Sequence, residues 1–154
     1  MTQQRIVLFV LLAATAVAAG GCAHPDAPKP VTLHVVERAE TDTLQHVGKP
    51  EEKDSLGDIL AFSNPLYDES NTNNVGTSNG VCFRTAVGST YECFWTATLP
   101  EGQLTVQGPF FDKKDSTLAI TGGTGDYDQA RGQMAVHARN AAGTEYDFTY
   151  TIVK

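Results

Sequence analysis

The chain has 154 residues and a formal net charge of −7. The first 21 residues contain one arginine and no acidic residue, so the rest holds ten basic and eighteen acidic residues. This acidic balance without a basic stripe excludes electrostatic binding to nucleic acid or to anionic lipid. The length suffices for one domain with a hydrophobic core, and the frequent Gly and Thr with few strong helix formers favour an all-β fold.

The N-terminus is arranged like a signal peptide. A short polar start with Arg5 precedes an apolar run over residues 6–17, and small residues follow at 18–21. The run is short for a transmembrane helix, so we predict that residues 1–21 form a signal helix that directs export. We therefore expect an extracytoplasmic protein.

Cys22 lies where a bacterial lipoprotein carries its lipidated cysteine. Residues 19–22, Ala-Gly-Gly-Cys, resemble a lipobox, although Ala19 stands where Leu is usual. Lipidation would anchor the protein in the cell envelope, with the lipid as its only membrane contact; the alternative is a secreted protein. Residues 22–30 contain three prolines and are predicted to be an extended tether before a domain over residues 31–154.

Short alternating or β-branched segments predict eight strands. The alternation is clearest near the C-terminus, where Tyr146, Phe148, Tyr150 and Ile152 occupy every second position, as in a half-buried strand. The predicted strands cover residues 31–37, 56–64, 79–87, 90–99, 103–111, 117–121, 131–139 and 145–154. Eight antiparallel strands joined by short turns can close into an up-and-down barrel without free edges, whose interior takes packed side chains or one small ligand.

Polar segments separate these strands. Residues 41–54 are charged and are predicted to form a solvated loop, and the turn-rich residues 68–78 a mobile loop at one end of the barrel. Pro65 is expected to lie just beyond the second strand. The third and fourth strands form a hairpin that turns at residues 88–89 or, one register earlier, at residues 87–88.

Several segments resemble one superfamily of barrels. TGGTGDYDQARGQ at residues 121–133 resembles the GGTGxFxxARG segment of dirigent proteins. VQGPF at 106–110 followed by LAITGGTG at 118–125 resembles allene oxide cyclases, as do GDILAFSNPLY at 57–67 and VGTSNGVCF at 75–83. The resemblance implies an eight-stranded antiparallel barrel. The three clustered glycines at its centre predict a corner where backbone has positive φ or passes close to a neighbour.

The resemblance also implies a ligand cavity, expected to have a volume of about a few hundred Å³. The residues that match its lining are Leu60, Phe62, Asn64, Cys82, Pro109 and Phe110. In the cyclases an asparagine set holds the reacting oxygen and a buried first-strand glutamate balances positive charge. Here Phe110 replaces a tyrosine, and His34 and Val36 are the nearest matches to the first-strand polar groups. Specific allene oxide cyclisation is therefore not what this sequence favours.

Dirigent proteins, in contrast, hold reactive molecules made elsewhere so that one stereochemical outcome prevails. Acidic groups and a tyrosine assist in many of them, and residues of these types here are Asp58, Asp126, Tyr127 and Asp128. The alternative for residues 126–128 is simple turn chemistry. We take Asn64, Cys82 and Asp58 as the candidate catalytic residues.

The two cysteines of the domain lie on the two arms of one hairpin. Cys82 and Cys93 face the same side if the turn is at residues 87–88, and export would favour a disulfide between them. The alternative, which the resemblance implies, is a free Cys82 thiol in the cavity. No cysteine or histidine spacing indicates a metal site, and no motif indicates a cofactor, so we expect neither.

Three functions fit the sequence. The first is an exported barrel that binds a small hydrophobic molecule and steers its stereochemistry. The second is an isomerase or cyclase on the same scaffold, and the third is a structural envelope lipoprotein with a filled barrel. The families that this chain resembles assemble as trimers through the outer wall of the barrel, which makes a homotrimer an expectation as well.

Overall fold

The computed structural model describes residues 28–154, which contain strands, turns and irregular segments. The predicted signal peptide over residues 1–21, the lipidation site Cys22 and most of the tether over 22–30 lie outside the described residues. Within residues 28–154 the structure has no helix that is long and apolar enough to span a membrane.

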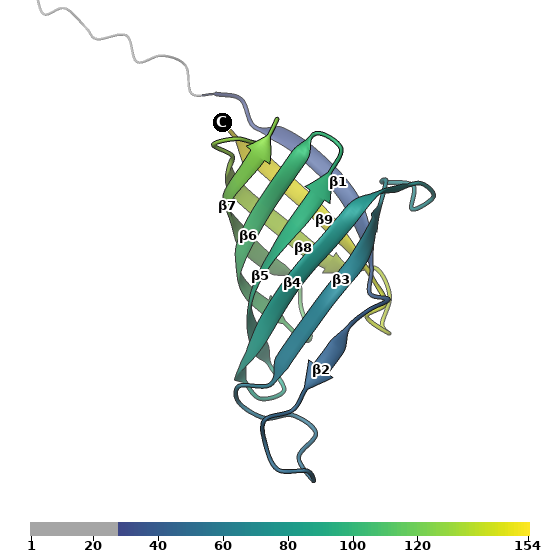
Figure 1. Ribbon diagram of the computed structural model, residues 1–154, viewed down its shortest axis with the longest axis vertical. Coiled ribbons are helices and arrows are strands. Elements are labelled where there is room, and N and C mark those ends of the chain that lie inside the picture. The colour runs from purple at the N-terminus through teal and green to yellow at the C-terminus, as the bar shows by residue number, and fades with distance from the viewer. Residues whose placement is uncertain (1–27) are drawn as a thin grey trace, which may run out of the picture.

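Nine strands form one antiparallel sheet that closes into a barrel (Figure 1). β1 pairs with β9 along its whole length and with β3 at Val36 and Glu37, which joins the two ends of the sheet. The strands are β1 (Val31–Arg38), β2 (Thr43–Gln45), β3 (Ile59–Tyr67), β4 (Asn74–Ala86), β5 (Thr90–Leu99), β6 (Gly102–Phe111), β7 (Ser116–Gly125), β8 (Arg131–Ala138) and β9 (Glu145–Val153). The predicted all-β class is confirmed. The predicted closed eight-stranded barrel is confirmed as well, because β1 and β2 both pair with β3 and together occupy one of the eight strand positions.

β1 and β2 are two halves of one barrel strand. Glu37 of β1 pairs with Leu66 of β3, and Thr43 of β2 pairs with Ala61. Six residue steps from Glu37 to Thr43 therefore face five steps along β3, so the break holds one extra residue, as a β-bulge does. The predicted solvated loop over residues 41–54 thus begins with a short, exposed strand.

β3 continues past the proline that was expected to end it. The Ser63 N–H donates to Thr41 on the edge of β3 that faces the break, and Pro65, two residues further on, faces the same edge. Because no ladder partner lies at the break, the missing N–H of Pro65 leaves no hydrogen bond unmade, and β3 runs to Tyr67.

Two further boundaries differ from the prediction. β4 begins at Asn74, inside the segment predicted as a mobile loop, so the connection after β3 is short. β7 runs on through the clustered glycines to Gly125, which has a positive φ of 61°. The glycines pair with β6, with a register shift between Thr105 and Val106. They therefore lie within the β6–β7 pairing and do not form the predicted corner after the strand.

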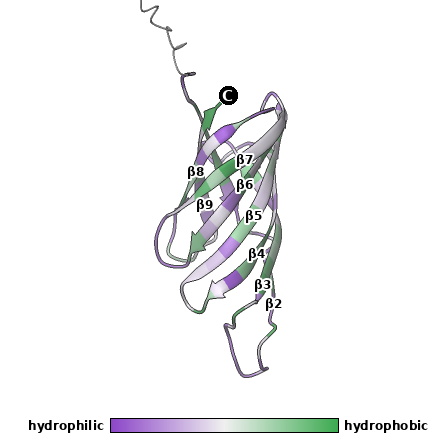
Figure 2. Ribbon diagram, turned by 90° about the vertical axis from the view of Figure 1, so that its left-hand side faces the viewer, coloured by the Kyte–Doolittle hydropathy of each residue, from purple (hydrophilic) through white to green (hydrophobic). Residues whose placement is uncertain are grey.

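Alternate side chains fill the interior. Hydrophobic and hydrophilic residues alternate along several strands in Figure 2. The buried residues of these strands are mostly apolar. The Trp95 ring stacks on Phe148, with 5.5 Å between ring centroids, and meets the edge of Phe62 at 5.9 Å. Gly80 pairs with both Phe62 and Trp95, and a Cβ atom there would collide with both side chains. The small glycine thus permits an aromatic layer across the barrel.

The antiparallel order places alternate connections at opposite ends. Residues 46–58, 87–89, 112–115 and 139–144 lie at one end, which we call the mouth. The connections after β3, β5 and β7 lie at the other end.

Candidate functional site

A cavity of about 60 Å³, which we call the inner cavity, lies inside the barrel. Pro109 is not part of its wall, because it neighbours an inward-facing residue and therefore points outward. The walls are Glu37, Asp42, Leu60, Phe62, Asn64, Cys82, Trp95, Phe110, Tyr146 and Phe148. The structure thus brings together five of the six residues that the resemblance placed in a ligand cavity; that they contact a ligand stays a prediction.

The inner cavity is much smaller than the few hundred Å³ that the resemblance implied. It has room for only a few water molecules, because the Trp95, Phe148 and Phe62 rings occupy the adjoining space. Pockets for whole organic ligands have volumes of about 300 Å³ or more. The inner cavity therefore accommodates one small group of a ligand rather than the entire molecule.

A larger cavity of about 320 Å³, the vestibule, opens at the mouth. It lies between the ends of β6 and β9 and the turns at residues 112–115 and 139–144. Phe110 and Tyr146 line the vestibule and the inner cavity alike. The two cavities are therefore neighbours that share an aromatic wall, and the vestibule is large enough for a small organic molecule.

The carboxylates of the vestibule already have partners. Both oxygens of Asp112 lie 2.8 Å from Nη1 of Arg84, and Asp115 lies 2.8 Å from Nδ1 of His137. Lys113, in contrast, has no ion-pair partner in the described part of the chain. The unpaired charge at the rim of the vestibule is therefore positive, although the protein as a whole is acidic.

Glu37 is the functional candidate that the sequence analysis missed. Its side chain follows Leu33 and Val35 on the inner face of β1, is only 5% exposed, and lines the inner cavity. Burial raises the pKa of Glu37 from 4.5 to about 7, although the nearby Ser78 hydroxyl and Asn64 amide lower it in part. The first strand therefore does carry a buried acid, contrary to the expectation from His34 and Val36.

Other polar atoms around Glu37 also lack partners. Glu37 Oε1, Ser78 Oγ, Trp95 Nε1 and Tyr150 OH are buried and make no hydrogen bond of standard geometry with any of residues 28–154. Burial also raises the pKa of Tyr150 well above its usual value, so its hydroxyl stays protonated. Buried polar groups normally have a hydrogen-bond partner. Of these residues, Glu37 and Trp95 line the inner cavity and are available there to water or to a polar group of a ligand, whereas Ser78 and Tyr150 line neither cavity.

Asn64, a predicted catalytic residue, is fully engaged in holding the broken first strand. Its Oδ1 accepts hydrogen bonds from the Glu40 N–H at 3.0 Å and from the Thr41 N–H and hydroxyl, both at 2.9 Å. Its Nδ2 donates to Asp42 at 2.8 Å. Asn64 is 1% exposed, and this geometry gives it a structural role even though it lines the inner cavity.

Asp58, another predicted catalytic residue, does not line either cavity. Its buried carboxylate accepts hydrogen bonds from the Val47 and Ser55 N–H groups at 2.9 Å and lies 2.9 Å from Nδ1 of His46. The Val47 N–H is the main reason that the pKa of Asp58 is below its usual value. Asp58 therefore organises the loop at the mouth.

The acidic and tyrosine candidates at residues 126–128 lie at the far end of the barrel. They form the turn between β7 and β8, where Asp126 N–H donates to the Glu101 carbonyl and Asp128 N–H to the Gly125 carbonyl. They line neither the inner cavity nor the vestibule. Their position fits the turn chemistry that we gave as the alternative.

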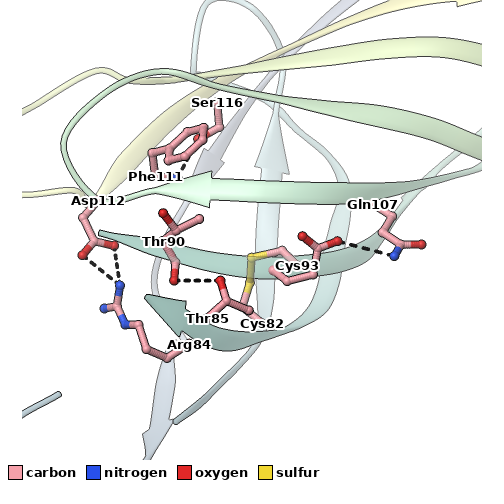
Figure 3. The surroundings of a disulfide bond; sticks show 10 residues. Cys82, Arg84, Thr85, Thr90, Cys93, Gln107, Phe111, Asp112 and Ser116 are labelled. Atoms are coloured by element: carbon pink, nitrogen blue, oxygen red, sulfur yellow. Dashed lines mark hydrogen bonds and ion pairs between the residues drawn. A yellow bond between two sulfur atoms is a disulfide. The ribbon is translucent and has the colours of Figure 1, made fainter. Parts of the chain in front are cut away.

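Cys82 and Cys93 form a disulfide between directly paired residues of β4 and β5 (Figure 3). Of the two predicted registers of this hairpin, the structure has the one with the turn at residues 87–88. This register puts both sulfur atoms on the inner face. Cys82 lines the inner cavity as half of this disulfide, so the free-thiol alternative does not describe the structure. Figure 3 also shows Arg84 of the same strand reaching Asp112 across the hairpin.

The remaining chemistry of the site is that of a proton donor and acceptor. A carboxyl group with a pKa near 7 is suited to general acid–base work at neutral pH, and it is surrounded by hydroxyl and indole donors. Among residues 28–154 no group of three His, Cys, Asp or Glu side chains is placed to hold a metal ion.

These observations define a closed β-barrel whose apolar interior encloses an acid next to a ligand-sized vestibule. The sequence profile of the allene oxide cyclase family matches residues 30–146. The chain therefore belongs to the allene oxide cyclase family.

Several solved structures share the fold. A pyocyanin demethylase is 27% identical, with 77% of this chain and 98% of that one covered and a TM-score of 0.65. The pterocarpan synthase dirigent protein PsPTS1 is 19% identical, with 84% and 99% covered and a TM-score of 0.66. The Diels-Alderase AbmU from Streptomyces koyangensis is 11% identical, with 88% and 72% covered and a TM-score of 0.60. The last two likenesses establish the fold alone.

Proposed function

We propose that this barrel binds a small hydrophobic molecule at its mouth and steers the stereochemistry of its reaction. Glu37 is the observation that carries the proposal: an ionisable carboxyl group with a pKa of about 7, enclosed by aromatic rings beside the vestibule. The names of the similar structures, a demethylase of pyocyanin, a pterocarpan synthase dirigent protein and a Diels-Alderase, support a small organic ligand.

The mechanism combines positioning with acid–base assistance. The body of the ligand lies in the vestibule, where aromatic walls restrict its orientation and so favour one product. Neutral Glu37 donates a hydrogen bond or a proton to the group that reaches it, and ionised Glu37 stabilises positive charge that develops there. Burial among rings strengthens both effects because the local dielectric is low.

Binding is tested with 8-anilinonaphthalene-1-sulfonate, a fluorescent aromatic anion. Trp95 is the only tryptophan of the chain and forms part of the inner cavity wall, so a dye in the vestibule quenches it by energy transfer. We expect saturable quenching that Phe111→Ala, in the vestibule wall, weakens and that Tyr67→Ala, on the outer wall, leaves unchanged. The absence of saturable binding favours the filled structural barrel instead.

Steering is tested with phenoxy radicals that a one-electron oxidant generates from a prochiral phenol, with the enantiomer ratio of the coupled products as the readout. An excess of one enantiomer that survives Glu37→Gln indicates positioning alone. An excess that Glu37→Gln abolishes, while the dye still binds, favours the second candidate, an isomerase or cyclase in which Glu37 is a catalytic acid. Racemic product with every phenol that displaces the dye contradicts steering.

We also propose that the protein is exported and lipidated at Cys22, on the basis of the N-terminal sequence alone. Globomycin, which blocks lipoprotein signal peptidase, is expected to cause a larger precursor to accumulate, and Cys22→Ser is expected to prevent lipid attachment. A precursor whose mass and location do not change with globomycin contradicts lipidation and leaves a secreted protein.

A homotrimer remains a proposal as well. Phe83 and Phe94 are 39% and 46% exposed on the outer wall of β4 and β5, with ring centroids 6.1 Å apart, and exposed aromatic pairs are typical of interfaces. Sedimentation at roughly tens of micromolar is expected to show a trimer that Phe94→Glu dissociates. A monomer at that concentration contradicts the proposal.

A further inference from the structure

The vestibule and the inner cavity are separated by a single pair of aromatic side chains. Phe110 and Tyr146 line both cavities, and their rings meet edge to face with centroids 5.8 Å apart and planes at 70°. Behind this pair lies Glu37, which is directly paired with Tyr146 in the sheet. A ligand in the vestibule is therefore separated from the acid by these two rings.

Both rings stand at the ends of their strands, next to the vestibule. Phe110 is the penultimate residue of β6, and Tyr146 is the second residue of β9. Both are half-buried, whereas Phe148, one inward position further along β9, is only 2% exposed. Partly exposed side chains change rotamer far more readily than those of a close-packed core.

The resting position of Tyr146 depends on a glycine in the neighbouring turn. A Cβ atom at Gly143 would lie 2.8 Å from the Tyr146 hydroxyl, so the hydroxyl occupies space that only glycine leaves open. Gly143 also has a positive φ of 64°, which glycine adopts without strain. The turn between β8 and β9 therefore sets where the ring of Tyr146 rests.

We propose that Phe110 and Tyr146 form a gate that determines which part of a ligand reaches Glu37. This inference rests on the proposed function, since it assumes a ligand in the vestibule. When the rings rotate apart, the vestibule and the inner cavity become one continuous space. Because the inner cavity holds only a group of a few atoms, the gate selects ligands with a broad body and one narrow terminal group.

Access through the gate is measured by acrylamide quenching of Trp95 fluorescence in the full chain. Trp95 is 5% exposed, is the single tryptophan, and lines both the inner cavity and a hollow on the outer wall of β4 to β7. The change in quenching between the wild type and a gate variant therefore reports entry to the inner cavity without a known ligand. We expect weak quenching of the wild type and an increase of about threefold or more in the Stern–Volmer constant for Phe110→Ala and for Tyr146→Ala. Tyr146→Phe, which keeps the ring, and Tyr67→Ala, on the outer wall, are expected to match the wild type.

Near-ultraviolet circular dichroism establishes that each variant is folded, and Phe110→Leu replaces any alanine variant that is not. Wild-type quenching in folded Phe110 and Tyr146 variants overturns the gate. If quenching stays low in the Phe110 and Tyr146 variants while dye binding depends on Phe111, ligand binding in the vestibule is supported and the proposed gate is contradicted. If quenching rises in the Phe110 and Tyr146 variants but the dye does not bind, the gate is supported and the proposed ligand binding is contradicted.

Discussion

The buried polar side chains of the protein fall into two groups that differ in their hydrogen bonding. Asn64, which holds the broken first strand, and Asp58, which holds the loop at the mouth, have partners for both of their terminal polar atoms. Glu37, Ser78 and Tyr150 each have a buried polar atom without one. The comparison teaches that residue type alone does not identify a functional group in this barrel. The saturated groups support the fold, and Glu37, which is unsaturated and lines the inner cavity, is free to meet a ligand.

The largest effect is expected from Asn64→Ala. The substitution leaves the N–H groups of Glu40 and Thr41 and the carboxylate of Asp42 without their buried partner, so we expect the free energy of unfolding to fall by about 3–5 kcal/mol. Urea denaturation measures the change. Ser63→Ala, at an exposed neighbouring position, is the control and is expected to change stability by about 0.5 kcal/mol or less.

An Asn64→Ala variant as stable as the wild type would remove the distinction between the two groups. If that variant also failed to bind the dye, Asn64 would belong with the ligand-contacting residues, as the sequence analysis first predicted.

A smaller effect, and one that depends on pH, is expected from Glu37→Gln. Because the pKa of Glu37 is raised from 4.5 to about 7 in the folded state, the folded protein holds this proton more tightly than the unfolded chain does. The wild type therefore loses stability as pH rises from 4.5 to about 7, by about 3 kcal/mol in all, and the variant does not. Denaturation of both proteins at pH 4.5, 6 and 8 gives the difference, in which the contributions of all other groups cancel. A difference that stays constant with pH contradicts the raised pKa.

The smallest effect is expected from Ser78→Ala. The Ser78 hydroxyl lies near Glu37 but makes no hydrogen bond of standard geometry within residues 28–154, so its removal is expected to change the free energy of unfolding by less than about 1 kcal/mol. Thermal unfolding measures this change. A loss as large as that of Asn64→Ala would place Ser78 among the saturated groups.

Much of the fold could be predicted from the sequence. Strict alternation located β9, the turn chemistry located the hairpin of β4 and β5, and the number of strands led to closure. Cys82 and Cys93 could be placed opposite each other because one of the two possible turns puts them in register. The break between β1 and β2 was not predictable, since β2 has only three exposed residues and no apolar pattern.

The site was harder to predict for physical reasons that differ from residue to residue. Glu37 follows two consecutive valines, Val35 and Val36, which are both buried, so the apolar pattern did not reveal which face of β1 points inward. The partners of Asn64 come from the unpredicted break. The small volume of the inner cavity depends on how the rings of Trp95 and Phe148 stack, which no sequence pattern specifies.

The most direct test of the account is the ionisation of Glu37, followed by the ¹³C chemical shift of its side-chain carboxyl carbon. The resonance is assigned by its absence from the spectrum of Glu37→Gln, and the shift is recorded from pH 3 to pH 9. We predict a titration midpoint near pH 7, as expected for an acid enclosed in the barrel. A midpoint near 4.5 would mean that the carboxyl group is solvated and would contradict the enclosed site.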